Sequence, residues 1–349
     1  MKQIYIFAED SRLKRLSEMG DPLEKVSGAV DWEIFRPILN RVFHKEVRGA
    51  GGRTPWDYIL MFKILLLQGW YNIADDKTEY MINDRLSFQR FLGLTLGDKV
   101  PDAKTIWLFR DTLSKCGADQ ELFYLFEMQM ETEGVITRKG SIVDASFVDA
   151  PRQRNSREEN QTIKEGNIPE DWKRPENASK LKQKDTDARW AKKNKETHFG
   201  YKDHVKVDAD SKMIVDFNVT AASVHDSQAM ASICDEKDEV INADSAYTGG
   251  KLELELKEKC GEGVVLNINE KGVRNNPLTD EQKASNREKS KVRVRVEHVF
   301  GHMTNSMGGM TIRCIGLTRA RCTIALKNLA YNLSRYAYLT STKNKLLAA

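Results

Sequence analysis

Three carboxylates in the sequence occupy positions where they could take part in chemistry: Asp144, Asp244 and Glu297. Asp144 lies in the β-branched stretch "SIVDASFVDA", and Asp244 ends the strand-like "DEVINAD" shortly before the turn "TGG". The ends of strands are where α/β sheets present reactive side chains. Mg²⁺ prefers oxygen ligands such as these, and two ions about 4 Å apart can clamp an in-line phosphoryl displacement. The three residues therefore predict metal-dependent phosphoryl transfer.

Acidic residues are too common for spacing alone to select this set. The chain holds 51 Asp and Glu residues, and Asp149, Asp208 and Asp226 lie near the same stretches. Spacing alone therefore leaves several combinations of three carboxylates open.

The segment around Glu297, "KVRVRVEHVFGHM" (Lys291 to Met303), fits two kinds of element. The alternating valines favour a strand. The apolar residues also fall on one helical face: Val292, Val296, Val299, Phe300 and Met303. We predict a helix because this pattern continues past His298. Arg293 and Glu297 then lie one turn apart, where the simplest interaction is an ordinary i,i+4 ion pair.

Charge is distributed unevenly along the 349 residues. The formal net charge is only +4, but from His298 to Ala349 there is no Asp or Glu. The same stretch carries seven basic residues: Arg313, Arg319, Arg321, Lys327, Arg335, Lys343 and Lys345. This polarity predicts one basic face, which suits a nucleic-acid partner.

The remaining composition favours a cytoplasmic protein with no membrane partner. Five cysteines occur without a CxxC spacing, which is typical of reduced thiols and not of a disulfide frame or a zinc site. There is no N-terminal signal pattern. The most apolar run, Tyr58 to Tyr71, contains Lys63 and is too short to span a bilayer.

The first third of the chain has helical periodicity from Trp32 to about Cys116. Thr54 and Pro55 predict the start of one helix. A second helix is expected over "DKTEYMINDRLSFQRFL", and a third after Asp102 as its N-cap. The tight links are compatible with a helix-turn-helix arrangement and equally with an ordinary bundle.

After Gly140 the pattern changes to strands and helices in alternation, which predicts an α/β domain with a mixed sheet. We expect a strand at "SIVDASFVDA", a hairpin turning at Asp208 to Lys212, and a strand at "DEVINADSAY". Helices are expected at "HDSQAMASIC" and "GGKLELELKEKC", and a buried strand at "GVVLNI".

Two polar insertions interrupt this domain. Residues 151–196 contain 13 Lys or Arg and 9 Asp or Glu and almost no aliphatic residues, so we predict a long mobile loop. Trp172 and Trp190 within it could stack on a flipped base or dock onto the protein. The second insertion covers residues 269–289.

Five motifs occur in an order that resembles one protein family. They are "GSIVDASFVDAP" around Asp144, "KETHFGYKDHVKVD", "TAASVHDS", "NADSAYTGG" around Asp244, and "RVRVEHVFG" around Glu297. The helical N-terminal stretch is similar to that family as well. Over roughly residues 30–340 the sequence resembles the DDE transposases of bacterial insertion sequences, specifically insertion sequence family five in the wider family-four-like group.

The resemblance implies an α/β fold, with a helical N-terminal DNA-binding domain before a ribonuclease-H-like catalytic domain whose mixed sheet is flanked by helices. It implies catalytic and metal-binding roles for Asp144 on the first strand, Asp244 after the fourth and Glu297 on a late helix. The implied cofactor is Mg²⁺ as two ions, with Mn²⁺ as a substitute. Similar enzymes cut an element's ends with metal-activated water, and the freed 3′-OH then attacks target DNA.

The wider group frames its glutamate with a Y-x2-R-x3-E-x6-K pattern. Arg293 fits the arginine, and the resemblance implies a phosphate contact there. Ser290 and Thr304 stand where the tyrosine and the lysine would be. What replaces those two partners is left open.

Three further residues are candidates for DNA contact: Lys202, His204 and Arg295. Lys202 and His204 lie in "FGYKDH" near the expected hairpin, and the alternative for them is a solvated lysine and a satisfied surface histidine. Asp226 in the "VHDS" motif resembles a family residue, but it could simply cap the following helix.

We therefore expect a peripheral segment at 1–30, a helical domain at 31–135, a catalytic domain at 136–340 and a basic tail at 341–349. The expected function is cleavage at the inverted repeats of an insertion sequence and joining of the 3′-OH ends to target DNA. A homodimer on double-stranded DNA, associated with the bacterial nucleoid, is the expected assembly. The alternatives are a ribonuclease-H-like nuclease without strand transfer and an inert DNA-binding regulator.

Overall fold

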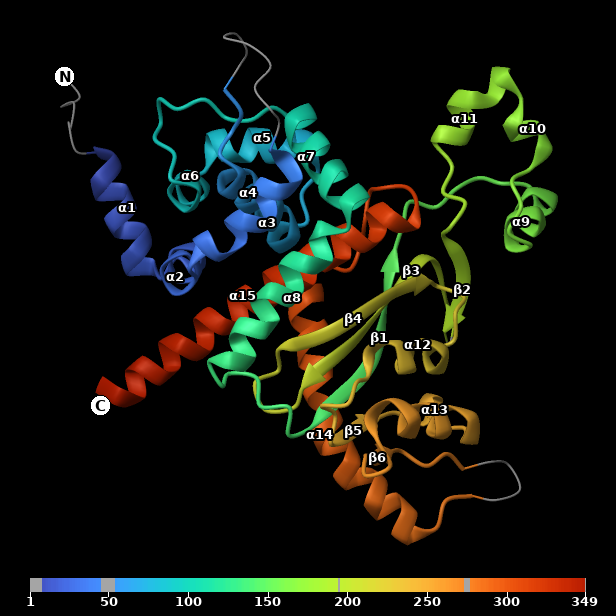
Figure 1. Ribbon diagram of the computed structural model, residues 1–349. Coiled ribbons are helices and arrows are strands. Elements are labelled where there is room, and N and C mark those ends of the chain that lie inside the picture. The colour runs from blue at the N-terminus through green and yellow to red at the C-terminus, as the bar shows by residue number, and fades with distance from the viewer. Residues whose placement is uncertain (1–7, 45–53, 194, 273–276, 349) are drawn as a thin grey trace. The chain divides into compact units, whose positions relative to one another are not determined.

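The computed structural model describes residues 8–44, 54–193, 195–272 and 277–348. The chain forms two compact units (Figure 1), one from residues 1–125 and 326–349, the other from Phe126–Ala325. The side chains of residues 343–349, which carry the charge of the expected basic tail, lie outside the described residues, as do residues 1–7 of the expected peripheral segment. The domain boundaries expected from the sequence remain predictions.

The first unit is helical, as predicted. Its helices are α1 (Ala8–Met19), α2 (Pro22–Ala29), the 3-10 turn η1 (Trp32–Phe35), α3 (Arg36–Phe43), α4 (Tyr58–Tyr71), α5 (Asp75–Asp84), α6 (Leu86–Leu92) and α7 (Ala103–Cys116). Helices α8 (Ala118–Thr132) and α15 (Leu317–Ala348) each run through the boundary between the units. Helix α4 is the centre of the core, since Phe62, Ile64 and Leu66 are fully buried. Trp70 Nε1 donates to Ala330 O at 2.7 Å, which fixes α15 in this core.

Local signals placed the helix starts with mixed success. Asp102 caps α7 as predicted, since its side chain accepts from Thr105 N. The cap predicted at Thr54 is wrong: Asp57 caps α4, which begins at Tyr58. The single helix predicted over 76–92 is two helices, because Arg85 between α5 and α6 has extended backbone angles.

The second unit is built on a six-stranded mixed sheet, as predicted. The strands are β1 (Ser141–Asp149), β2 (Arg189–Lys193), β3 (Glu196–Asp208), β4 (Ile214–Ala221), β5 (Val240–Ala243) and β6 (Val265–Ile268). Their order is β2-β3-β1-β5-β6, and β4 also pairs with β3. The long strand β3 pairs with β1 along one edge, and with β2 and then β4 along the other. The hairpin predicted at 208–212 joins β3 and β4.

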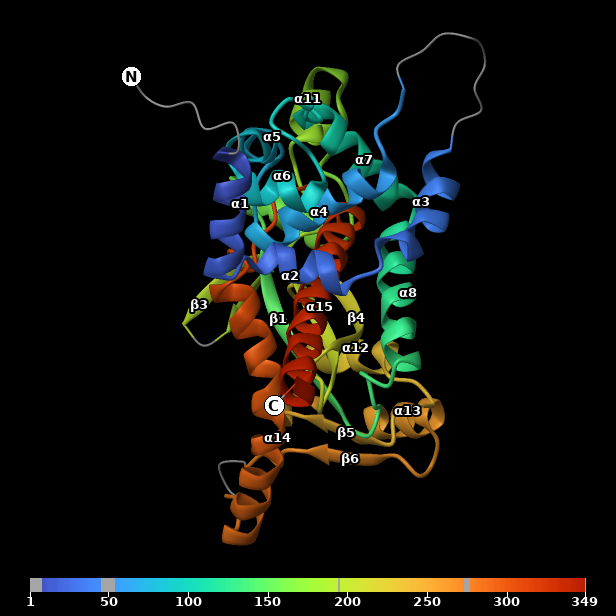
Figure 2. The ribbon, with the colours of Figure 1, turned by 90° about the vertical axis from the view of Figure 1, so that its left-hand side faces the viewer.

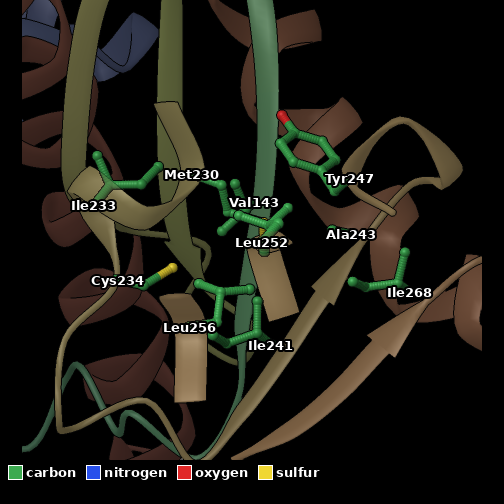
Figure 3. Close-up of a cluster of buried hydrophobic side chains, with 10 residues drawn as sticks. All are labelled: Val143, Met230, Ile233, Cys234, Ile241, Ala243, Tyr247, Leu252, Leu256 and Ile268. Atoms are coloured by element: carbon green, nitrogen blue, oxygen red, sulfur yellow. The ribbon is translucent and has the colours of Figure 1, made fainter. Parts of the chain in front are cut away.

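Helices cover the sheet on two sides. In the two views, α14 (Asp280–Asn305) lies on one side of β1, and α12 (Asp226–Ile233) and α13 (Gly250–Cys260) lie on the other (Figure 2). The α12 side holds a buried cluster with Val143, Met230 and Ile241 (Figure 3). Helix α14 packs against β1 and β5, which confirms the helix predicted for "KVRVRVEHVFGHM".

Strand β6 is less buried than predicted. Among the described strands it pairs only with β5 and so forms an edge of the sheet. Val265 at its start is 51% exposed. The continuous apolar run "GVVLNI" therefore indicated a strand correctly, but not its burial.

The insertion predicted as a mobile loop is folded. It contains α9 (Arg157–Lys164), α10 (Glu170–Lys173), the 3-10 turn η2 (Pro175–Asn177), α11 (Ala178–Lys182) and then β2. Trp172 is 0% exposed, and its Nε1 donates to Glu159 at 2.7 Å. Lys180 and Lys184 lie 5.4 and 5.3 Å from its ring. One aromatic ring with cations around it therefore replaces the aliphatic core that the composition lacks.

The insertion also holds the start of α15. Asp185 accepts hydrogen bonds from the Tyr201 hydroxyl at 2.8 Å and from Gly316 N at 3.2 Å. Asp187 accepts from Leu317 N at 2.8 Å. Two carboxylates of the insertion thus satisfy amides at the helix start that have no partner within the helix.

The second insertion, the cysteines and the apolar helices were also the subject of predictions. The second insertion, predicted at 269–289, becomes helical from Asp280, where Thr279 caps α14; residues 273–276 lie outside the described part. Within the residues that the structure describes, all five cysteines are free, and no helix is long and apolar enough to cross a membrane.

Replacing Trp172 by Ala should destabilise the folded insertion. Removing a fully buried Trp costs about 3–5 kcal/mol, so we expect a lower unfolding free energy and rapid proteolysis within 151–193. Denaturant melts and limited proteolysis measure both. Trp190→Ala is the matched control: this ring is 40% exposed, and we expect a loss of about 1 kcal/mol or less. Equal effects of the two changes would contradict the buried role of Trp172.

Candidate active site

The pairing of β1 with β5 brings the two aspartates together. The strands are parallel, and Ser141 and Ile142 lie opposite Ile241 and Asn242. Asp144 lies two residues further along β1, and Asp244 lies two residues further along the other chain segment, one residue past the end of β5, so the charge of Asp244 acts on Asp144. Asp244 directly follows β5 and caps the 3-10 turn η3 (Ser245–Tyr247), accepting from Ala246 N at 2.8 Å. The two aspartates therefore lie on neighbouring strands of the sheet, and their role as metal ligands stays a prediction.

Helix α14 brings Glu297 to the same edge. Val296, Val299 and Met303 are fully buried, and they fix which face of α14 meets the sheet. Arg293, one turn before Glu297, lies between two of the carboxylates. Its Nη1 is 3.8 Å from Asp244 Oδ2, and its Nη2 is 3.5 Å from Glu297 Oε1. One guanidinium therefore joins the second and third predicted residues.

Asp144 is held in an unfavourable setting for a charge. The pKa of its carboxyl is raised to about 6, mainly by burial and to a smaller extent by the charge of Asp244, against the opposing effects of the Ala145 amide, Arg293 and Lys193. Asp144 accepts a hydrogen bond from Ala145 N at 2.8 Å, a bond that favours the ionised form. A carboxylate placed beside another in this way is stabilised when a cation binds next to it.

The donor set fits a divalent metal by residue type. Three carboxylates offer only oxygen ligands, as Mg²⁺ requires. The Tyr247 hydroxyl and Arg293 Nε are buried close to this edge without a hydrogen-bond partner in the described part of the chain. Among the described residues, however, no three acidic, His or Cys side chains already converge on one ion position. Arg293 supplies the positive charge between Asp244 and Glu297 in this conformation.

Lys202 and His204, predicted to contact DNA, are both buried within the second unit. Lys202 is 9% exposed, and its Nζ donates to Val224 O and to Asp226, each at 2.7 Å. His204 is 1% exposed, its Nε2 lies 2.8 Å from Thr220 Oγ1, and burial lowers its pKa to about 4. Both side chains are used inside the unit, which argues against the DNA contacts expected from "FGYKDH" and against the solvated alternative.

The other candidate positions are also engaged within the protein. Arg295 donates to Ala209 O and lies 3.3 Å from Asp210, so it holds the β3–β4 turn. Ser290 accepts a hydrogen bond from Asn269 at 3.3 Å, and Thr304 is exposed. The cap of α12 is His225, not Asp226 as the sequence suggested.

Two residues near the carboxylates were missed by the sequence reasoning. Burial raises the pKa of Tyr247, and the charges of Asp144, Asp226 and Asp244 raise it further. Its position three residues after Asp244, in "DSAY", was the available signal. The second is Lys193 at the end of β2, whose charge acts on Asp144. No sequence signal connects Lys193 with Asp144, because the two come close only through the backbone conformation of Gly200.

The fold defines a class: a ribonuclease-H-like domain, here with Asp144 on the first strand and Asp244 directly after the neighbouring strand β5. A family model described as "Transposase DDE domain" matches residues 137–333, and one described as "Transposase domain (DUF772)" matches residues 11–112. The chain belongs to the family of transposases that carry a DDE domain.

One solved structure is similar in outline. It is the cryo-EM structure of a piggyBac transposase synaptic complex with hairpin DNA, with 12% sequence identity and a TM-score of 0.46. The match covers 93% of this chain and 76% of that chain.

Asp144→Asn should change the pH dependence of stability in metal-free buffer. Because the folded pKa, about 6, lies above the ordinary value of 3.8, the stabilising contribution of Asp144 is fully present below pH 4 and is lost as pH rises through 6. The variant lacks this loss. The unfolding free energy of the variant minus that of the wild type should therefore be larger at pH 8 than at pH 4 by on the order of 2–3 kcal/mol. Denaturant melts with a chelator at both pH values measure this. Parallel pH profiles for both proteins would contradict the raised pKa.

Proposed function

We propose that this chain is the transposase of a bacterial insertion sequence of family five. It binds the terminal inverted repeats, cleaves the phosphodiester bonds at the element's ends and joins the 3′-OH ends to target DNA. The observation that carries the proposal is that Asp144, Asp244 and Glu297 lie around Arg293 on neighbouring elements, in a chain of the DDE-domain transposase family.

Each residue has a role in this proposal. Asp144 and Asp244, with Glu297, hold two Mg²⁺ ions, and Mn²⁺ serves as a substitute. When bound, such ions activate the attacking oxygen and neutralise charge on the phosphate. The raised pKa of Asp144 makes cleavage depend on its deprotonation. Arg293, which meets Asp244 and Glu297 in the free protein, is the residue we assign to a phosphate when DNA is bound.

The substrate and assembly follow from the same chemistry. Double-stranded DNA is the proposed partner, held mainly through phosphate contacts and therefore salt-sensitive. Two ends must be cut and joined, so we propose a homodimer on DNA, working in the cytoplasm at the nucleoid. Lys202, His204 and Arg295 hold the fold together in this proposal.

Asp244→Asn should abolish cleavage while leaving DNA binding intact. Loss of one metal-holding carboxylate should slow cleavage by on the order of 10³-fold. Excision of the element in cells and cleavage of end-containing DNA in vitro measure the effect, with repeat binding as the control. Unchanged excision by the variant would mean that the chain acts as a DNA-binding regulator with an inert catalytic fold.

Strand transfer separates a transposase from a ribonuclease-H-like nuclease. A pre-cut element end with a free 3′-OH should become joined to a plasmid in the presence of Mg²⁺, and Glu297→Gln should prevent this joining. Gel analysis of plasmid products detects it. Hydrolysis without joined product would favour the nuclease.

A further inference from the structure

The hairpin of β2 and the start of β3, residues 189–199, turns back sharply at Gly200. The φ angle of Gly200 is +150°, a region that side chains rarely enter. A Cβ there would lie 2.3 Å from Val148 O and 2.7 Å from Ala150 N. Only glycine allows β3 to approach the end of β1 this closely and then leave it.

The folded-back hairpin is fixed against the end of β1. The ring of His198 stacks on Phe147 with centroids 4.2 Å apart and planes 3° apart. Its Nδ1 lies 3.1 Å from Asp149 Oδ1, and Ala150 N donates to Phe199 O at 2.8 Å. The hairpin thus lies on the strand that carries Asp144.

Strand alternation determines which lysine faces β1. In the β2–β3 register, Ala191 pairs with His198 and Lys193 pairs with Glu196. Side chains two apart share a face, so Lys193 lies on the same face as His198, toward β1. Lys192 and Trp190 lie on the opposite face. The charge of Lys193 accordingly reaches Asp144 and lowers its pKa.

Lys193 is exposed and has no ion pair among the residues that the structure describes. Glu196 opposite it is directed to His198 Nε2, at 3.9 Å. A cation held over carboxylates that already have Arg293 nearby adds little to stability. It is well placed to meet an anion that lies across this edge.

We propose that Lys193, carried over β1 by the hairpin that bends at Gly200, contacts a backbone phosphate of DNA lying across the Asp144–Asp244 edge. The inference rests on the proposed function and extends it. Lys193 is a positioning residue here: it holds the DNA backbone beside the carboxylates and takes no part in bond breaking.

Binding of a short mixed-sequence DNA duplex, measured by fluorescence anisotropy over a range of salt concentrations with a chelator present, tests this contact. Lys193→Gln should make the slope of log K against log[salt] less steep by about 0.9, as expected for one lost phosphate contact. Lys192→Gln is the matched control, because it removes the same charge one residue away on the other face. Its slope should stay at the wild-type value.

Gly200→Ala tests the bend. It should reduce the slope as much as Lys193→Gln, and the double variant should lose no more than either single change. If circular dichroism shows that Gly200→Ala does not fold, the salt slopes of Lys193→Gln and Lys192→Gln alone test the inference. The inference is overturned if Lys193→Gln keeps the wild-type slope or if Lys192→Gln lowers it equally.

The outcome is distinguishable from failure of the proposed function. A slope change at Lys193 in a protein that neither cleaves nor joins DNA would support the contact and overturn the transposase proposal. Cleavage and joining with equal slopes for the Lys193 and Lys192 variants would overturn only the contact. A wild-type protein that does not bind the duplex would overturn both.

Discussion

Repulsion between two carboxylates on neighbouring parallel strands is the constraint around which the second unit is arranged. The parallel pairing of β1 with β5 just before Asp144 and Asp244 keeps the two side chains near each other, and the burial of Asp144 weakens the solvent screening that would otherwise reduce their repulsion. The protein supplies compensation from outside the sheet. Arg293, from a helix on one side, gives the larger part, and the exposed Lys193, from a hairpin that returns over β1, adds a smaller one. The core must hold both elements firmly for this balance to persist.

Strand β1 is central because three different elements use it. Its hydrogen-bonding edges pair with β3 and β5, one face supports α14, and its end supports His198 through Phe147 and Asp149. Arg293 and Lys193, which come from distant parts of the sequence, therefore both lie near Asp144 on this strand. The extra strand β2 also explains why Asp244 follows the fifth strand along the chain, whereas the resemblance implied the fourth.

The sequence was informative where local pattern and global fold agree. The mixed sheet, the β3–β4 hairpin and the helix carrying Glu297 followed from periodicity, whereas the choice of Asp144 and Asp244 among many acidic residues came from the family resemblance. The folded insertion was missed because its core is small and centres on Trp172 with polar partners, which composition cannot distinguish from a loop. Lys202 and His204 were misplaced because their burial depends on Asp226 and Thr220, which only the tertiary pairing brings near. Lys193 was missed because its position depends on one backbone angle at Gly200.

The insertion's hold on the start of α15 limits how the chain can change. Asp185 and Asp187 bond backbone amides 131 and 130 residues away, contacts that form only after most of the chain has been ordered. A deletion that removed the insertion would leave those amides without acceptors. The insertion therefore cannot be deleted without affecting the start of α15, although its polar composition resembles that of a linker. A relative with a shorter insertion would need another acceptor at the start of this helix.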